Sequence, residues 1–412
     1  MTAILLALLS GVVLAAASDG APSFKLEMSS GEVVVGPLAA WSEGSLEIGA
    51  RGDQAGRKLA PGDVVLLTAV RPAGRARGQD VILLAAPEGG GPADRLVGRL
   101  DAGDEYGVTL DLAGSLQVGL PYEVVDRILP LADRPLDLLA GLQDGGFDDR
   151  IWKRRDDGGM DGISGVLAAA SPEGLKLESA MGDLAFPLEE VLAIVLAEPE
   201  PLSDALPGWP CRLALAGGSA FAAGLLDVDS EGLTVSTGFA ERLVIPAGIV
   251  DSLLFGPTDD APPALVSRQA PVEVHEWTLF GDDVAVLFPW RRDLAVAGEL
   301  LVLDGLHATS GLGVHAHSRL TFEVPEGAAA LRMTVGLTAD TAVLAAEGSV
   351  TFKVFVDEEL VATVGPLGEQ DGSRPLRVAP LRAGQRLTLE VDAGGDDEAG
   401  DRAAWADAVF LP

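Results

Sequence analysis

The sequence predicts an all-β chain, with small β-barrel repeats in its N-terminal part and a β-sandwich at its C-terminal end. Glycine and proline are abundant, with 51 and 26 copies in 412 residues. Such a composition favours many turns and short strands over long helices. Four segments before residue 257 share one glycine-containing pattern, and later segments such as residues 349–356 alternate apolar and polar side chains. That alternation is typical of strands with one buried face.

The length predicts several domains, because a single hydrophobic core rarely serves more than about 250 residues. Changes in composition along the chain suggest where the boundaries fall. The predicted organisation is a signal peptide (1–21), two small barrel-like repeats (22–135), a linker or long loop (136–160), two further repeats (161–256), a Pro-rich linker (257–271) and a sandwich (272–412).

The N-terminus predicts export. An apolar run from Ala3 to Ala17 ends in small residues, which is the pattern of a secretory signal and its cleavage site. The run is short for a membrane span, which needs roughly 20 residues. We therefore expect no membrane span after signal cleavage, and a location in the periplasm, the cell envelope or the extracellular space.

The repeat pattern consists of a strand, a glycine turn, a returning strand and a proline before an apolar run. The two glycines of each copy are 8, 9, 9 and 8 residues apart. The second glycines are Gly44, Gly107, Gly174 and Gly232, and the prolines are Pro61, Pro121, Pro187 and Pro246. We expect these glycines to occupy equivalent turns, because glycine adopts positive φ without strain. Five short strands of this kind close into an SH3-like or Sm-like barrel, and the segments resemble the small barrel repeats of bacterial envelope proteins.

The charge balance limits the partners. The chain carries 29 basic and 62 acidic residues, a formal net charge of −33. Nucleic acid is an unsuitable ligand, since binding a polyanion requires clustered Lys and Arg. Cys211 is the only cysteine, so an intrachain disulfide is excluded, and we expect this residue to be buried in a strand.

The predicted linker between the second and third repeats is rich in Gly, Asp and Arg and has no period. Trp152 lies in it, followed by Lys153, Arg154 and Arg155. This indole could serve as a docking site for a partner, or it could pack against a neighbouring barrel.

Three motifs occur in order in the C-terminal third, at Gly311–Ser318, Gly348–Asp357 and Gly400–Ala408. In this order they resemble the NPCBM/NEW2 domain, also called the glycosyl hydrolase family 98 putative carbohydrate-binding module (CBM51). The resemblance implies a jelly-roll sandwich of the galactose-binding type and a glycan ligand of galactose type. Two positions depart from the family pattern, the acidic turn at residues 357–359 and Ala404 in the last motif.

The resemblance also implies which residues face the sugar: His315, Asp401, Trp405 and Asp407. Sugars are recognised by an aromatic face together with carboxylate or imidazole groups, and these residue types fit that need. Two alternatives stay open, in which Trp405 is a core residue and His315 only fixes the neighbouring loop. His317 is expected to be a partly exposed residue without a role in binding.

An acidic, glycine-rich run spans residues 392–401. Carboxylate oxygens on a loop are ligands that Ca²⁺ prefers, which makes Asp392, Asp396 and Asp397 candidates for a structural calcium site. A solvated acidic turn is the alternative. No further cofactor is expected.

The sequence lacks the HExxH, GxSxG, P-loop and GxGxxG motifs, so we expect no enzyme. The predicted function is glycan recognition by an exported, non-catalytic protein through its C-terminal module. One alternative is an envelope structural or interaction protein that docks a protein partner and has lost sugar binding. Another is an enzyme with an unrecognised site in the repeats.

Overall fold

In the residues that the computed structural model describes, the regular secondary structure consists of β-strands and short 3-10 helices. The structure describes residues 22–42, 44–49, 56–60, 62–70, 80–84, 94–130, 147–155, 157, 159–203, 205–229, 232–258, 260–278, 289–339, 348–395 and 400–412. The predicted signal peptide lies outside the described residues. The chain divides into two compact units, a first unit of residues 1–37, 60–70 and 254–412 and a second unit of residues 38–59 and 71–253.

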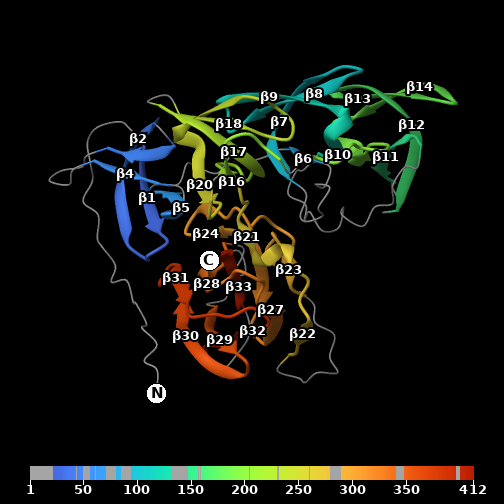
Figure 1. The fold of residues 1–412 in the computed structure, drawn as a ribbon. Coiled ribbons are helices and arrows are strands. Elements are labelled where there is room, and N and C mark those ends of the chain that lie inside the picture. Colours follow the sequence, from blue (N-terminus) through green and yellow to red (C-terminus); the bar gives the residue numbers. More distant parts are fainter. Residues whose placement is uncertain are drawn as a thin grey trace. The chain divides into compact units, whose positions relative to one another are not determined.

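Two antiparallel sheets in the first unit form the C-terminal sandwich (Figure 1). One sheet has the order β23-β26-β33-β28-β31, with strands Arg291–Arg292, Gly311–His315, Arg402–Leu411, Ala330–Leu337 and Arg374–Val378. The other has the order β22-β27-β32-β29-β30, with strands Glu273–Glu276, Ser318–Glu323, Arg386–Ala393, Ser349–Val356 and Glu359–Gly368. A separate pair consists of β24 (Val302–Leu303) and β25 (Leu306–His307).

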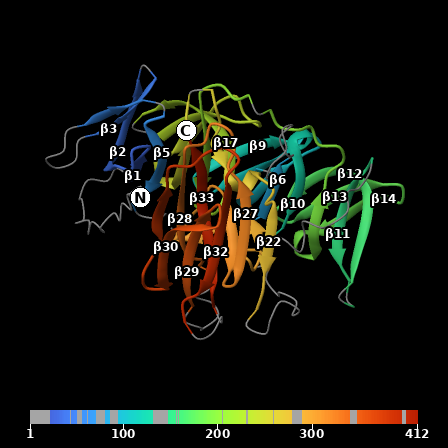
Figure 2. The ribbon, with the colours of Figure 1, turned by 60° about the horizontal axis from the view of Figure 1, so that its bottom comes forward.

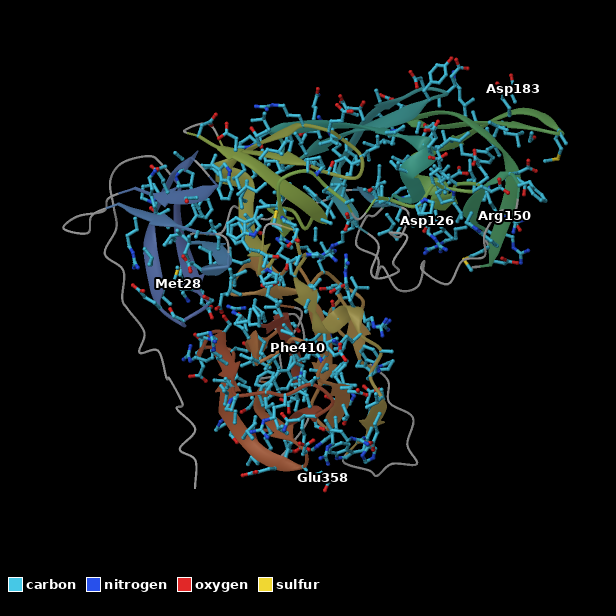
Figure 3. The ribbon with its side chains drawn as sticks, viewed as in Figure 1. Met28, Asp126, Arg150, Asp183, Glu358 and Phe410 are labelled. Carbon is cyan, nitrogen blue, oxygen red and sulfur yellow. The ribbon has the colours of Figure 1, made fainter. Side chains whose placement is uncertain are left out.

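The alternation in the sequence explains the core of this sandwich. In β29 every second residue is buried, so that Val350, Phe352, Val354 and Val356 face inward as predicted. Strand β32 lies beside β29 in the same sheet (Figure 2) and contributes apolar side chains to the same core. Figure 3 labels Phe410, a buried residue of the facing sheet that belongs to this core. The expected all-β fold with a C-terminal sandwich is confirmed.

The predicted Pro-rich linker is wrong over residues 264–268. Ala264–Leu265 forms strand β21, which pairs with β33, and Val266–Arg268 forms the short 3-10 helix η4. Val266 has no exposed surface and belongs to the sandwich core. Burial of apolar side chains holds this segment in the fold despite its prolines.

The first unit also contains N-terminal strands. Strand β1 (Ser23–Met28) pairs antiparallel with β5 (Val64–Ala69). Val65 and Leu66 of β5 pack with Val409 of the sandwich in one buried apolar cluster. Within the first unit, the buried apolar side chains of the sandwich are therefore continuous with those of β5.

The second unit contains most of the remaining strands. These are β3 (Ser45–Ile48), β4 (Arg57–Leu59), β6 (Asp80–Leu84), β7 (Arg95–Gly103), β8 (Gly107–Leu112), β9 (Leu116–Pro121), β10 (Val125–Leu129), β11 (Asp149–Arg154), β12 (Met160–Ser171), β13 (Gly174–Ser179), β14 (Gly182–Pro187), β15 (Val191–Val195), β16 (Trp209–Leu215), β17 (Ala220–Val228), β18 (Gly232–Ser236) and β19 (Leu243–Pro246). Single 3-10 turns η1 (Tyr122–Val124), η2 (Leu188–Glu190) and η3 (Ala247–Ile249) follow β9, β14 and β19. Strands β2 (Val33–Ser42) and β20 (Val250–Phe255) belong partly to each unit.

The second unit shows the same register shift in four hairpins. A residue is inserted after a leucine of the first strand, which is the geometry of a β-bulge. The shifts lie between Leu38 and Ala40, Leu100 and Ala102, Leu167 and Ala169, and Leu225 and Asp227. Within two strand sets the first and last strands also pair, β6 with β10 and β11 with β15.

The repeat glycines differ from the expectation in one respect. Gly107, Gly174 and Gly232 each lie opposite the proline of the returning strand. A Cβ at Gly232 would lie 2.0 Å from the carbonyl oxygen of Ile245, so close backbone approach requires glycine there. Gly44 instead has φ +72° in the turn before β3, so the four glycines do not occupy equivalent positions.

The predicted linker 136–160 is wrong for its last part. Strand β11, Asp149–Arg154, pairs with β12 on one side and β15 on the other, and its Ile151 is fully buried. Trp152 is half-buried, with the Arg150 guanidinium 5.6 Å from its ring centroid. The sequence did not predict this strand, because most of its residues are charged or polar. Its stability comes from backbone pairing with a neighbouring strand on each side.

Two predictions about individual segments can be checked. Cys211 is buried in β16, as expected, and burial raises the pKa of its thiol to about 12. Within the described residues, we find no helix with the length and apolar character needed to cross a bilayer.

Candidate functional site

His315 and Asp401 lie next to each other at one end of the sandwich. The backbone N–H of Ala316 donates to the Asp401 carbonyl oxygen at 3.0 Å. The Asp401 side chain is buried, and its Oδ1 accepts a hydrogen bond from the Ser349 N–H at 2.6 Å. Asp401 therefore fixes the backbone around His315.

Trp405 lies in the core. It has no exposed surface, and its ring contacts Phe352 edge-on with 4.9 Å between the centroids. Strand β33 alternates within the sheet, and the position of Trp405, opposite Leu312 of β26, faces the sandwich interior. The expectation that this indole offers a face to a sugar is corrected, since the packing alternative describes the structure.

Asp407 is also buried. Its Oδ1 accepts hydrogen bonds from the Thr309 N–H at 2.8 Å, from the Thr309 hydroxyl at 2.6 Å and from the Ser310 N–H at 3.4 Å. Burial raises the pKa of this carboxyl above its usual value, and the hydrogen bonds from Thr309 and the charge of Arg332 only partly offset that effect. Asp407 holds the segment before β26 and offers no surface to a ligand.

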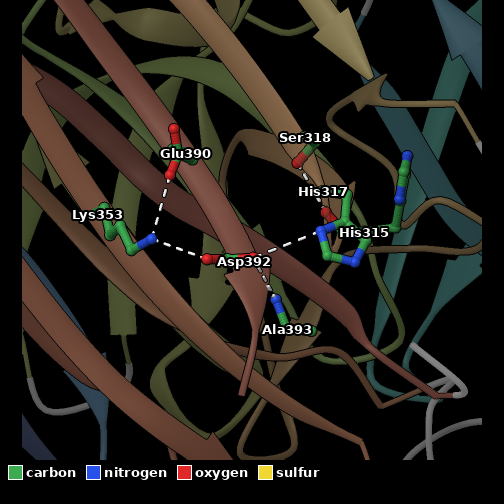
Figure 4. A network of polar contacts seen from close by, with 7 residues as sticks. All are labelled: His315, His317, Ser318, Lys353, Glu390, Asp392 and Ala393. Atoms are coloured by element: carbon green, nitrogen blue, oxygen red, sulfur yellow. Dashed lines mark hydrogen bonds and ion pairs between the residues drawn. The ribbon is translucent and has the colours of Figure 1, made fainter. Parts of the chain in front are cut away.

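His317 occupies the turn between β26 and β27. Its φ of +65° is a left-handed conformation, which is uncommon for a residue other than glycine. The imidazole is buried, and its Nδ1 lies 3.4 Å from Oδ1 of Asp392 (Figure 4). The expectation of a partly exposed residue is therefore wrong, because the turn directs the ring against its neighbours.

Asp392 joins His317 to Lys353. Its Oδ2 lies 2.8 Å from Lys353 Nζ, and its Oδ1 accepts a hydrogen bond from the Ala393 N–H at 3.0 Å. Partial burial raises the pKa of Asp392, but the hydrogen bond and charge of Lys353 outweigh it, and the net pKa lies below the usual value. In the same way, the hydrogen bond with Asp392 raises the pKa of Lys353.

The predicted calcium site remains a prediction. Asp392 uses its oxygens on Lys353 and Ala393, while Asp396 and Asp397 lie outside the described residues. In the part of the chain that the structure describes, no group of three or more His, Cys, Asp or Glu side chains is placed to hold a metal ion.

Trp277 is the aromatic residue that the sequence analysis missed. Its ring centroid lies 5.6 Å from that of His317 and 4.8 Å from that of His275. Trp277 is half-buried and His275 is exposed. The signal in the sequence was the spacing of His275 and Trp277, two residues apart, which in extended chain places both side chains on one side; Trp277 directly follows the short edge strand β22.

These residues form one connected set of side chains, which extends from β22 at the edge of the sheet to β29 and which we call the Trp277 surface. It consists of His275, Trp277, His317, Lys353 and Asp392. An indole offers an apolar face, while ammonium, carboxylate and imidazole groups donate and accept hydrogen bonds. This combination suits a ligand with apolar C–H faces and many hydroxyls.

His315 lies in a neighbouring cluster. Its Nε2 is 3.2 Å from Oε1 of Glu276, and that oxygen accepts a hydrogen bond from the Trp290 N–H at 2.7 Å. The guanidinium of Arg292 lies 5.7 Å from the centroid of the Trp290 ring. Glu276 is the chain neighbour of both His275 and Trp277, so the His315 cluster and the Trp277 surface share this part of the chain around β22.

The C-terminal sandwich matches a known family over residues 273–411. The matched family is the NPCBM/NEW2 domain. The resemblance seen in the three sequence motifs is thereby confirmed, and the family is one of carbohydrate-binding modules. All the residues of the Trp277 surface and the His315 cluster lie within the matched residues. No curated protein matches the chain.

Solved structures of CBM51 modules are similar to the chain. The CBM51 module of Clostridium perfringens GH95 in complex with methyl-galactose has 21% identity, covers 36% of this chain and 98% of that chain, and gives a TM-score of 0.31. CBM51-2 with INT domains from Clostridium perfringens ZmpB, in complex with GlcNAc, has 20% identity over 48% of this chain and 40% of that chain, also at 0.31. The tandem CBM51 modules of a Streptococcus pneumoniae family 98 glycoside hydrolase have 11% identity over 94% and 88%, at 0.31.

Proposed function

We propose that the NPCBM/NEW2 domain binds a glycan at the Trp277 surface. The observation that carries this proposal is the half-buried indole of Trp277, which contacts the imidazoles of His275 and His317. His317 in turn lies beside the Asp392–Lys353 pair. The family match supports the class of ligand, and the geometry supports its place.

Binding is weakened when side chains must be immobilised on contact with the ligand. Trp277 is in contact with His275 and His317, and the Lys353 ammonium is fixed by Asp392 and Glu390. Such groups lose little freedom when a sugar ring stacks on the indole and its hydroxyls reach the charged side chains.

The His315 cluster is the second part of the proposal. We infer that His315 and Glu276 flank the sugar and hold the backbone of Trp290 in place. Of the four residues that the family resemblance implied, only His315 belongs to this second part of the proposed site. The other three residues have buried side chains and stabilise the sandwich without touching the sugar; they are Asp401, Trp405 and Asp407.

The wider setting follows from the sequence. We propose that the chain is exported, on the basis of its apolar N-terminal run, and that it serves as a binding protein without catalysis of its own. Galactose and N-acetylglucosamine are the first ligands to examine, because similar modules were solved with methyl-galactose and GlcNAc.

A glycan array probed with the full chain tests the proposal. We expect selective binding to glycans that end in one sugar type, with binding reduced for Trp277→Ala. A chain that binds no glycan on an array that includes galactose and N-acetylglucosamine termini would contradict the proposal. That result would favour the alternative in which the sandwich docks a protein partner.

A further inference from the structure

Strands β7, β8 and β9 of the second unit carry a hollow of about 450 Å³ on their outer face. The three strands lie side by side (Figure 1), with Ala102 opposite Thr109 and Thr109 opposite Gly119. Residues paired in this way project from the same face of a sheet, and here Ala102 and Gly119 are exposed. All three line the hollow, together with Asp104 and Tyr106. The volume lies within the range of about 300–1,000 Å³ that is typical of ligand pockets. We call this feature the Tyr106 hollow.

Two other repeats carry larger side chains at the positions that form the base of the hollow. Thr109 stands two residues after the repeat glycine, where the third repeat has Lys176. Gly119 stands two residues before the repeat proline, where the fourth repeat has Val244. A Cβ at Gly119 would meet no atom within 4 Å in the described part of the chain, its chain neighbours apart. Gly119 therefore keeps the hollow open although the packing of the backbone does not require glycine there.

Tyr106 is an exposed aromatic residue that the backbone holds in place. It lies in the turn between β7 and β8, and 75% of its surface is exposed. Its N–H donates to Asp104 Oδ1 at 2.9 Å, and its carbonyl oxygen accepts a hydrogen bond from the Tyr122 N–H at 3.1 Å. The residue before the repeat glycine is glutamate in the other three repeats, at Glu43, Glu173 and Glu231. The second repeat thus places an aromatic ring beside the hollow where the others have a carboxylate.

The surroundings of the hollow are acidic. Between Arg99 and Glu123, Arg99 is the only basic residue, and the acidic residues are Asp101, Asp104, Glu105, Asp111 and Glu123. Arg99 is itself paired with Asp111, with 3.4 Å between Nη2 and Oδ2. An aromatic face attracts ammonium and guanidinium groups, and nearby carboxylates add to this attraction. The net charge of −33 also favours the approach of a cation and repels an anion. A cationic side chain is therefore the best complement to the hollow.

We propose that the Tyr106 hollow binds a basic segment of a protein partner, with a Lys or Arg side chain against the Tyr106 ring. The methylene stem of that side chain covers the small residues of the hollow, and its charged group meets Asp104. Asp104 Oδ1 accepts hydrogen bonds from the N–H groups of Tyr106 and Gly107, which leaves Oδ2 for the ligand. This site is separate from the proposed glycan site, because the hollow lies in the second unit and the family match covers residues 273–411.

Fluorescence anisotropy with the full chain tests the inference at physiological ionic strength, where attraction between distant charges is screened. The probes are short labelled peptides in which serine alternates with lysine, with arginine or with acetyl-lysine. We expect binding of the lysine or arginine peptide and no binding of the uncharged acetyl-lysine peptide. Tyr106→Ala should raise Kd by about threefold or more, as for the loss of an exposed cation–π contact. Tyr106→Phe should bind like the parent, because it keeps the aromatic ring.

Gly119→Val fills the hollow without a change of charge, and Gln117→Val is its matched control. Gln117 is exposed on the same strand, two residues before Gly119 and on the same face, but it does not line the hollow. Gly119→Val should weaken binding as Tyr106→Ala does, whereas Gln117→Val should bind like the parent. Failure of both cationic peptides to bind, or equal binding of the acetyl-lysine peptide, would overturn the inference. Parent-like binding in Tyr106→Ala or Gly119→Val, or an equal loss in Gln117→Val, would also overturn it.

Discussion

Glu27 and Arg332 form a buried ion pair between residues 305 positions apart in the sequence, with 2.6 Å between Oε2 and Nη2. Glu27 belongs to strand β1, and Arg332 belongs to β28 of the sandwich. Arg332 Nη1 also donates to the Asp407 carbonyl oxygen at 3.5 Å. The pair ties the N-terminal strand to the NPCBM/NEW2 domain inside the first unit, so the two parts depend on each other for stability.

A double-mutant cycle tests this dependence. Glu27→Gln leaves the Arg332 guanidinium buried without its counter-ion, and we expect the first unit to lose about 3–5 kcal/mol of unfolding free energy. Replacing both residues, as Glu27→Leu with Arg332→Met, should recover most of the loss, because no charge then stays buried. Urea denaturation followed for the first unit measures the cycle. Equal losses in the single and double variants would argue against a coupled pair.

The same pair predicts a pH dependence. Burial alone raises the pKa of Glu27, but the charge and hydrogen bond of Arg332 outweigh it, so the net pKa lies below the usual value. For a carboxyl whose pKa is depressed by folding, stability is present above the unfolded pKa, about 4.3, and is lost as the pH falls through the folded pKa. Melting temperatures of the parent should therefore fall more steeply below about pH 4.3 than those of Glu27→Gln. Parallel curves for the two proteins would refute the assignment.

Asp407 makes the opposite prediction. Because burial raises its pKa in the folded chain, the ionised carboxyl costs stability once the pH exceeds the unfolded pKa, and this cost grows until the folded pKa is reached. Asp407→Asn should be at least as stable as the parent at neutral pH, since the amide oxygen accepts the same hydrogen bonds and Asn tolerates the φ of +47°. Asp407→Ala should cost about 1–3 kcal/mol, because the Thr309 donors lose their acceptor. Thermal unfolding of the two variants at neutral pH measures the difference, and equal destabilisation by Asn and Ala would count against it.

The histidines at the site give a fourth prediction. His315→Ala should weaken glycan binding by about 1–3 kcal/mol. The substitution removes the imidazole that lies 3.2 Å from Glu276 Oε1, and Glu276 is proposed to flank the sugar. His317→Ala should weaken it as well, since the ring contacts Trp277, although the sequence alone predicted little change. His317→Gly controls for the turn, because glycine keeps the left-handed φ and removes the imidazole. Titration calorimetry should give the same loss for Gly and Ala, and unchanged affinity in both would separate His317 from the site.

The sequence predicted those parts of the fold in which local pattern and packing agree. The alternation around Phe352 identified a strand and its buried face, and the three C-terminal motifs identified the family. Strand β11 was missed because its stability comes from two neighbouring strands rather than from apolar residues of its own. The segment around Val266 was missed because its prolines suggested a linker, although Val266 itself is buried in the core.

The site was harder to predict than the fold. Trp405 stands among small residues, and the sequence does not show whether such a tryptophan faces the core or a ligand. Its orientation toward the core is established by its pairing with Leu312 in the sheet. Trp277 gave a weak signal because it follows a strand of four residues. The imidazole of its partner His317 contacts the indole because His317 adopts a left-handed backbone conformation, which the spacing of residues in the sequence does not predict.

The affinity of Trp277→Ala for the glycan selected by the parent tests the central claim most directly. Trp152→Ala is the matched control, since Trp152 is also half-buried but lies in the second unit. For a tryptophan at the centre of a binding surface, we expect Trp277→Ala to lose about 2 kcal/mol or more, about thirtyfold in Kd by titration calorimetry. Trp152→Ala should bind like the parent. Parent-like affinity in Trp277→Ala, with the variant folded, would contradict the account.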